Sequence, residues 1–396
     1  MSQLVAALEA SHALWLDGQP RSAGALRAVF VRDLSFDAQD RTAIDAMIDA
    51  RPETGVFLSP PWLSGYFVDP PKRTEQGVLL LRDATHLRGM VPLALCRTFT
   101  HTRVRLVGGG LGSDRLDLLA QRGFEAMCAD ACLAWLRETF GPRGFVLELR
   151  DVCSSSALWG AIHRSAMDRV DGLIVQPREL YPLPFLRLGT DAPIADGAPA
   201  EKTLRSIEKH RRLLARRFRI EVRLLTDGAD VLDAFGELTA LLHARWRGGD
   251  ESSVLDDPRI ARFHRHVLPQ LLAAGRLRMI RTTADGRTIA VFYGLAAGTW
   301  WGYYLAGYDR ERAGRVHLGQ VTLATAIEMA AAEGATEFDF LKGAEPVKYL
   351  WPVHERTAVD ADVFSRSCGV QFTRATRATR DATAALTKSA RALFFC

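Results

Sequence analysis

The feature of this sequence that most restricts its fold is a weak internal repeat of strands and helices. In each half, two aliphatic or β-branched runs flank a short polar turn, which is the pattern of a β-hairpin. The hairpin strands are Val78–Arg82 with Met90–Cys96, and Leu277–Thr282 with Thr288–Ala296. Each half then continues with a strand, a glycine-containing loop, a helix and a closing strand. The strand, the helix and the closing strand are expected at 103–107, 124–139 and 145–150 in the first half. In the second half they are expected at 300–306, 318–333 and 336–341. Corresponding points lie roughly 190–200 residues apart, so the sequence predicts two copies of one α/β unit. Each copy is expected to have its own central sheet, and the two to meet along a cleft.

Length and composition agree with two globular units. The chain has 396 residues, 48% of them hydrophobic and 24% charged, which fits two domains and excludes a disordered or collagen-like protein. There is no uninterrupted apolar run long enough for a membrane span, and the N-terminus lacks the pattern of a secretory signal. The six cysteines form no C-x-x-C pair, so we expect a cytoplasmic protein without a metal site. Cys128 and Cys132, one helical turn apart on an apolar face, are expected in the core.

The repeat suggests domain boundaries. Residues 1–188 are expected to form a degenerate N-terminal domain, and 201–366 a C-terminal domain that carries the active site. Residues 189–200 are rich in Gly, Pro, Ala and Asp, which is typical of a linker. The basic tail 367–396 can form an amphipathic helix that contacts a membrane surface, or a frayed terminus.

A basic run precedes the second copy. Residues 201–220 hold eight Lys or Arg against two Glu, so this helix can meet phosphates or an acidic substrate, or present a solvated face. Lys209 and Arg212 are its candidate substrate-binding residues. Further helices are expected at 231–247 and 260–273.

The loop before the helix at 318–333 is a candidate phosphate site. Its glycines allow close approach of the backbone, its arginines carry charge, and the helix N-terminus adds the positive end of its dipole. The candidate residues are Arg312, Gly314, Arg315, Val316, His317, Leu318, Gly319 and Gln320.

Several segments resemble one known family. FDFLKGAEPVKYLW at 338–351, LAGYD at 305–309 and the following L-G-x-x-x-L are similar to the cellulose-biosynthesis-type acetyltransferases of the GNAT superfamily. Weaker matches, such as FLSPPWL at 57–63 and LHARW at 242–246, extend the resemblance over most of residues 55–365. The resemblance implies a tandem GNAT fold (α/β, with mixed sheets), akin to the Fem-type aminoacyltransferases. It also implies acyl transfer from acyl-CoA, acetyl-CoA above all. The chain departs from the family pattern at His317-Leu318-Gly319, where a small polar residue and proline commonly precede the glycine.

The loop after the last repeat strand holds the first catalytic candidate. Acyl transfer to an amine needs a base, and Glu345, flanked by Lys342 and Lys348, is expected to hold an ammonium acceptor or take its proton. An ordinary charged turn is the alternative. Asp339 on the strand is either a structural ion pair or a site residue, and His243 on a helix ranks third.

In the first copy, Gly108–Gly112 lacks the Gly-Lys-Ser/Thr of a P-loop and is expected to be a turn. Asp114 and Asp117 after it can line the cleft. His264 and His266 are expected on an exposed helix face.

Three functions remain open from the sequence. The first is an acyl-CoA-dependent N- or O-acyltransferase acting on a small-molecule or glycan acceptor, as in polysaccharide biosynthesis. The second is a Fem-type aminoacyltransferase whose basic helix grips tRNA, the only case in which a nucleic acid is expected. The third is a non-catalytic partner of a polysaccharide synthase.

Overall fold

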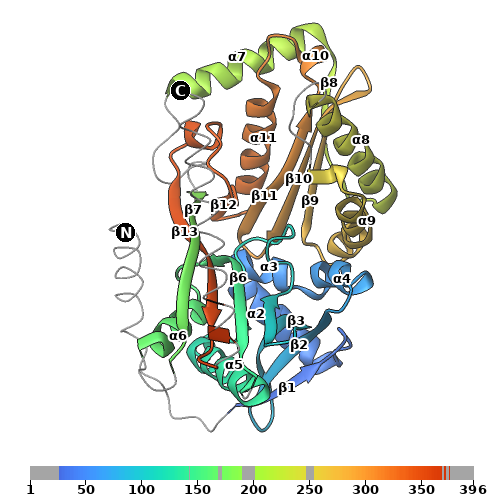
Figure 1. Cartoon of the computed structure of the whole chain (residues 1–396). Coiled ribbons are helices and arrows are strands. Elements are labelled where there is room, and N and C mark those ends of the chain that lie inside the picture. Colours follow the sequence, from blue (N-terminus) through green and yellow to red (C-terminus); the bar gives the residue numbers. More distant parts are fainter. Residues whose placement is uncertain are drawn as a thin grey trace, which may run out of the picture.

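The computed structural model describes residues 26–141, 143–167, 172–189, 201–246, 254–367, 370–371 and 374. Its strands form a single mixed sheet of 13 strands (Figure 1). The order is β1-β2-β3-β4-β6-β13-β7-β12-β11-β10-β9-β8, with β5 paired to β3 off this path. Residues 190–200 and most of the expected tail lie outside the described residues.

The N-terminal part contributes seven strands: β1 (Arg27–Val31), β2 (Glu75–Arg82), β3 (Leu87–Arg97), β4 (Thr102–Leu106), β5 (Leu119–Ala120), β6 (Phe145–Cys153) and β7 (Ile174–Arg187). Its helices are α2 (Ala38–Ala50), α3 (Pro52–Leu58), α4 (Pro60–Val68), α5 (Glu125–Phe140) and α6 (Ala157–Met167).

The C-terminal part contributes β8 (Ile220–Leu224), β9 (Leu277–Ala284), β10 (Arg287–Ala297), β11 (Trp300–Tyr308), β12 (Glu337–Asp339) and β13 (His354–Phe364). Its helices are α7 (Glu201–Arg217), α8 (Gly228–Trp246), α9 (Pro258–Ala273), α10 (Arg310–Ala313) and α11 (Leu318–Ala332), with short 3₁₀ turns at Val254–Asp256 and Lys348–Leu350.

The predicted repeat is confirmed. The hairpins β2–β3 and β9–β10 are antiparallel, and each is followed by a parallel pair, β4–β6 or β11–β12, connected through α5 or α11. Side chains alternate along β10: Val291 and Tyr293 pack in the same core as α8, whereas Phe292 packs with α11. This alternation places α8 and α11 on opposite faces of the sheet.

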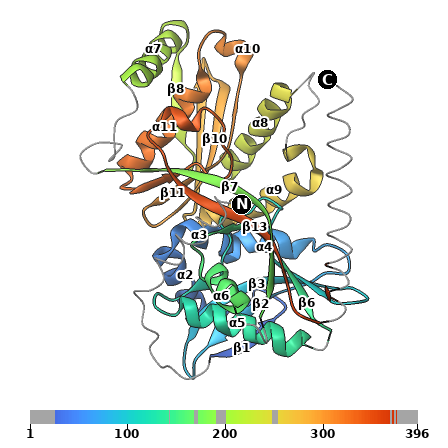
Figure 2. The same ribbon diagram turned by 60° about the vertical axis from the view of Figure 1, so that its left-hand side comes forward.

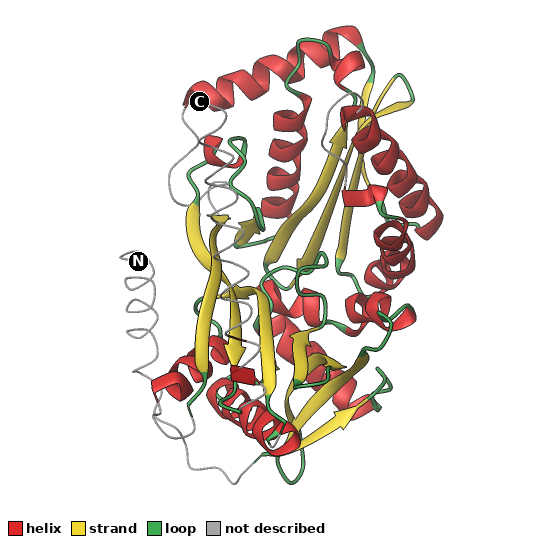
Figure 3. Ribbon diagram, viewed as in Figure 1, coloured by secondary structure: helices red, strands yellow, loops and turns green. Residues whose placement is uncertain are grey.

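The prediction of a separate sheet in each half is wrong, because the last strands of the two copies change places. β13, from the second copy, pairs with β6 of the first, and β7, from the first copy, pairs with β12 of the second. The two exchanged strands also pair with each other over most of their length. Figure 3 shows the strands running from the lower half into the upper half of the molecule. Backbone hydrogen bonds therefore join the two copies.

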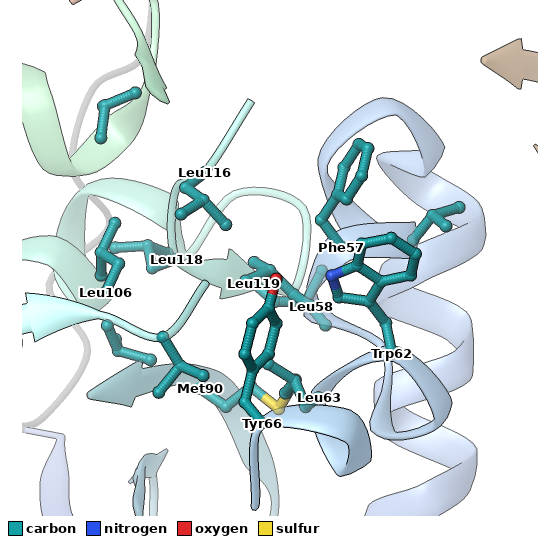
Figure 4. Packing of buried hydrophobic residues seen from close by; sticks show 14 of the residues in the cluster. Phe57, Leu58, Trp62, Leu63, Tyr66, Met90, Leu106, Leu116, Leu118 and Leu119 are labelled. Carbon is teal, nitrogen blue, oxygen red and sulfur yellow. The ribbon is translucent and has the colours of Figure 1, made fainter. Parts of the chain in front are cut away.

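An aromatic core also joins the copies, where α4 packs against α9. Trp62 lies beside Phe57 and Phe263, and Figure 4 shows Trp62 and Tyr66 of α4 against the leucines of the N-terminal part.

His264 is only 1% exposed and lies among these rings. Its expected place on an exposed face is wrong, because α9 is covered by α4 of the other copy. Burial lowers the pKa of His264 to about 3, so the ring is neutral at pH 7. Cys128 and Cys132 are buried, as predicted.

Candidate active site

The parallel strands β11 and β12 separate soon after they pair. Only Trp300–Gly302 of β11 pair with β12, at Glu337–Asp339. Tyr303–Ala306, the next residues of β11, are half-buried although the strand lies inside the sheet. Beyond Gly302, the described strand β12 pairs with no residue of β11, so an extended ligand that carries amides of its own can pair with β11 beside Leu305 and Ala306.

The corresponding opening in the N-terminal part is closed by the chain itself. Leu116 forms an isolated parallel bridge to Val152, the residue before Cys153 at the end of β6, and its N–H donates to Asp151 O at 2.7 Å. In the N-terminal part, the segment 108–117 therefore occupies the place next to β6 that corresponds to the unpaired side of β11 in the C-terminal part.

The loop expected to bind phosphate leads from β11 into α11. α11 begins at Leu318, as predicted, and its N-cap residue His317 makes no side-chain capping bond. Among the described N–H groups of the loop, those of Arg315, His317 and Gly319 have no hydrogen-bond acceptor. Gly319 lies against Tyr308, where an added Cβ would come within 3.0 Å of the ring. Free N–H groups at a helix start are a ready anion site.

The side chains of this loop divide into two groups. Val316 and Leu318 are buried in a small core with Leu214 of α7, and Gln320 is half-buried. Arg312 turns away from the helix start: its Nη2 donates to Ala284 O at 3.3 Å, and its guanidinium lies over Phe218. Arg315 and His317 are exposed, and Gly314 has a φ of 60° at the turn.

The basic helix α7 packs against α11. Figures 1 and 2 place α7 and α10 at the same end of α11. The ring of His210 lies 4.5 Å from that of His317. Burial, His317 and Lys209 together lower the pKa of His210. Lys209 and Arg212 are exposed, and Arg212 pairs with Glu208 at 2.9 Å. α7 therefore reaches the start of α11 through His210 and lies beside Gly314 through Arg217, whereas Arg211 pairs with Glu328 further along α11.

At the other side of the opening, Asp339 is fully buried and forms an ion pair with Arg115. Its Oδ1 accepts from the N–H of Leu341 at 2.8 Å, and Trp300 Nε1 lies 3.4 Å from Oδ2. Asp339 thus connects the end of β12 to the loop 108–117 of the first copy.

Lys342 follows directly, after Leu341, whose φ of 56° is unusual for a side chain of this type. The ammonium group of Lys342 donates to Asp151 at 2.9 Å and lies over the ring of Tyr181. Burial lowers the pKa of Lys342, but the hydrogen bond and charge of Asp151 outweigh it and raise the pKa overall. The side chain is 46% exposed, so a charged ammonium reaches the surface of the site.

Asp114 holds the backbone of Lys342: its Oδ2 accepts from the Lys342 N–H at 2.7 Å. Burial raises the pKa of Asp114 to about 6, although that hydrogen bond opposes the rise. A carboxyl group with a pKa near neutrality can exchange a proton at physiological pH.

Glu345 and Lys348 belong to the loop that follows. Glu345 is 59% exposed and pairs with Lys348 Nζ at 2.8 Å. Lys348 itself is buried, and its ammonium donates to the carbonyl oxygens of Lys342 and Gly343. Lys348 therefore stabilises the loop, while Glu345 is the exposed carboxylate next to Lys342.

Two candidates lie elsewhere. Asp117 accepts from the N–H groups of Ala157 and Leu158 at the start of α6 and pairs with Arg51. His243 on α8 contacts Asp256 in the 3₁₀ turn before α9.

Sequence reasoning missed Arg115, Asp151 and Tyr181. Arg115 stands between two residues that were singled out, and Asp151 follows the expected end of a closing strand. Their importance arises only from the pairing of the two copies, which brings residues more than 190 positions apart into contact.

In the part of the chain that the structure describes, no group of three or more His, Cys, Asp or Glu could hold a metal ion. Of the described helices, none is long and apolar enough to cross a membrane.

Comparison with protein families gives a match in the C-terminal part of the chain. Residues 201–349 match the family model described as an acetyltransferase (GNAT) domain. The fold is similar to the crystal structure of FemX, at 10% identity and a TM-score of 0.55, covering 88% of this chain and 99% of that chain. It is also similar to a conserved protein of unknown function from Bacteroides thetaiotaomicron, at 12% identity and a TM-score of 0.50, covering 86% and 99%. A search of curated proteins gives no match.

Proposed function

We propose that this chain is an acyltransferase whose donor is acyl-CoA, acetyl-CoA in the simplest case. Residues 201–349 match the model of an acetyltransferase (GNAT) domain. The acceptor is the amine of a small molecule or amino sugar, in a pathway such as polysaccharide biosynthesis. The observation that supports this most is that, at the start of α11, the N–H groups of Arg315, His317 and Gly319 have no acceptor among the described residues, while β11, which precedes this loop, pairs with β12 only at Trp300–Gly302.

In this proposal the loop 312–320 and α11 hold the pyrophosphate of the donor. Arg315 adds charge from the exposed side, and Lys209 and Arg212 of α7 face the remaining phosphate. The amide-containing arm of the donor runs along Tyr303–Ala306, so its thioester arrives near the end of β12.

The chemical step needs a base and a group that stabilises negative charge. Glu345 holds the incoming ammonium group, and Asp114 accepts its proton. The amine nitrogen then forms a bond to the acyl carbon, and the carbon–sulfur bond breaks. Lys342 stabilises the charge that develops on the thioester oxygen. The thiolate of CoA leaves and takes the second proton of the nitrogen, through water, so the products are a neutral amide and the thiol of CoA.

Calorimetry with acetyl-CoA tests the proposal. The wild-type chain should bind acetyl-CoA, and Arg315→Glu should weaken binding at least tenfold, because it puts a carboxylate beside the phosphates. Arg223→Glu makes the same charge change on β8, where Arg223 is exposed, and should bind as the wild type does. If the folded wild-type chain does not bind acetyl-CoA, the proposal is wrong.

The exposed cations of α7 favour one second candidate, an aminoacyltransferase that takes its donor from tRNA. Contacts to phosphates make such binding strongly dependent on salt. Titration with total tRNA between 50 and roughly 200 mM salt tests this candidate. Binding of tRNA without binding of acetyl-CoA would favour it over the first.

A further inference from the structure

A cavity of about 380 Å³ lies outside the residues assigned above. It is open to solvent and is lined by β2, β3 and β4 of the N-terminal part, the loop after β4, the end of α4 with the segment after it, and the start of α9. Its volume falls within the roughly 300–1,000 Å³ that is typical of small-molecule sites.

One wall of the cavity is apolar. Tyr66, Leu106 and Val107 line it and are buried, and Figure 4 shows Tyr66 and Leu106 within the packed core. Val68 and Leu111 also line the cavity, yet they are 58% and 56% exposed. A row of aliphatic side chains therefore leads from solvent into the interior.

The opposite lining is positively charged. Five Lys or Arg line the cavity against two Asp: Lys72, Arg103, Arg105, Arg259 and Arg262, with Asp69 and Asp257. The aspartates pair with Arg262 and Arg259. Arg103 and Arg105 share the single carboxylate of Glu148, which is buried behind them. The cavity thus has positive charge in excess, which favours an anionic ligand.

A polar atom in the lining lacks a partner. Gln76 lines the cavity, and its Oε1 is buried with no hydrogen-bond donor among the described residues. A ligand N–H or O–H would satisfy it.

The cavity is adjacent to the end of β12 through one loop. Leu111 lines the cavity and its carbonyl accepts from Tyr66 Oη at 3.1 Å. Three residues later, Asp114 accepts from the N–H of Lys342. Three residues span at most about 11 Å, so the edge of the cavity at Leu111 lies within about that distance of Asp114.

We propose that this cavity binds the acceptor, and that the acceptor is an amine with a compact apolar group and a carboxylate or phosphate. The anion lies against Arg105, the apolar group packs on Tyr66 and Leu106, and a donor of the ligand satisfies Gln76. The proposal rests on the acyltransferase function, since it names the acceptor of that reaction.

Cys96 provides a direct probe, because its thiol lines the cavity and is half-buried. The rate at which N-ethylmaleimide alkylates Cys96, resolved by peptide mass spectrometry, reports occupancy without any turnover. Phenylalanine and leucine supply a carboxylate, phenyl phosphate supplies a phosphate, and phenethylamine lacks the anion. We expect phenylalanine or leucine, or phenyl phosphate, to slow alkylation at least fivefold, and phenethylamine to leave it unchanged. Which anion protects identifies the class of acceptor.

Two variants localise the effect. Arg105→Ala should raise the half-protecting concentration at least fivefold, and Glu148 keeps its two hydrogen bonds from Arg103. Val68→Trp, at an exposed position, should block entry. Arg164→Ala removes an exposed arginine paired with Asp130 on α5 and should protect as the wild type does. The proposal is overturned if Arg105→Ala is protected as well as the wild type. It is also overturned if none of the anions protects the wild-type chain at 10 mM, which is about tenfold above the upper end of the usual range of KM.

Calorimetry with acetyl-CoA separates this outcome from a failure of the proposed function. If acetyl-CoA binds and Cys96 is not protected, only the cavity assignment is wrong. If Cys96 is protected and acetyl-CoA does not bind, the cavity is a binding site but the chain is not a CoA-dependent transferase.

Discussion

At the scale of single residues, the charged groups around β12 differ in burial, and burial separates their roles. Asp339 and Arg115 are buried and form an ion pair, although Arg115 Nε has no hydrogen-bond partner among the described residues, whereas Glu345 is exposed. Asp114 lies between these extremes: it is buried, but its pKa is raised toward neutrality. A buried pair supports structure, and an accessible or perturbed carboxylate can act on a substrate.

Asp339→Asn should lower the free energy of unfolding by about 3 kcal/mol, because it leaves the buried guanidinium of Arg115 without its carboxylate. Glu337, 3.5 Å from Arg115, limits the loss. Denaturant unfolding measures it. Asp130→Asn makes the same chemical change in an exposed pair and should cost at most about 1 kcal/mol. Equal small losses would mean that the Asp339–Arg115 pair contributes nothing to folding.

Glu345→Gln should raise KM for the acceptor and lower kcat/KM at least tenfold, because the neutral amide no longer attracts an ammonium group. Its affinity for acetyl-CoA should not change, and its melting temperature should fall only slightly, because the buried ammonium of Lys348 loses the carboxylate of Glu345 but keeps the carbonyl oxygens of Lys342 and Gly343. Steady-state kinetics with a small amine acceptor provide the measurement. Turnover at the wild-type rate would make Glu345 an ordinary surface residue.

The raised pKa of Asp114 predicts how the rate of the reaction depends on pH. Its pKa of about 6 in the folded chain means that the carboxyl group is protonated below that value and cannot accept a proton. We therefore expect kcat to rise with pH through about 6 and then to level off, and Asp114→Asn to lose both activity and this limb. Because the folded pKa lies above the unfolded one, the stability contributed at Asp114 decreases as pH rises from about 4 to about 6. If kcat of the Asp114→Asn variant still rises with pH near 6, another group is the base.

At the scale of elements, the position of α7 in the fold favours a binding role for the basic residues of 201–220 over a merely solvated helix face. Alone, eight cations in twenty residues could equally be a solvated helix face. In the fold, α7 packs on α11, and His210 contacts the N-cap residue His317. His210 and Arg217 of α7 therefore lie beside the loop in which the N–H groups of Arg315, His317 and Gly319 have no acceptor among the described residues.

Lys209→Glu should weaken binding of CoA several-fold and leave binding of dephospho-CoA unchanged, because only CoA has the 3′-phosphate that α7 is proposed to meet. Lys202→Glu places the same change at the far end of α7, on another exposed lysine, and should affect neither ligand. Calorimetric titrations of each of the two variants with CoA and with dephospho-CoA measure these affinities. Parallel weakening of both ligands by Lys209→Glu would show a general field effect instead.

At the scale of the whole molecule, local patterns predicted most elements, and long-range pairing decided the rest. Both hairpins, α5, α9 and α11 lie within a few residues of their predicted ranges, because alternation and helical periodicity are local signals. β7 and β13 were not predicted, since their partners lie far away in the sequence. His264 was misplaced for the same reason: the helix that buries it belongs to the other copy. Within the site, Glu345, Lys342 and Asp339 come from one motif, whereas Arg115 and Asp151 depend on the exchange of strands.

The exchange of β7 and β13 predicts that the two copies unfold together. Val363 of β13 is buried and lies opposite Leu147 of β6 and Val175 of β7, so Val363→Ala should cost about 1.5–3 kcal/mol. Because β13 pairs with β6 of the first copy and β7 continues to β12 of the second, the loss should reach the slowest-exchanging amides of β3 and β10 equally. Native-state hydrogen exchange, read for each strand, measures this. Loss of protection confined to β3 would show that the copies unfold independently, and that the shared sheet does not make them one cooperative unit.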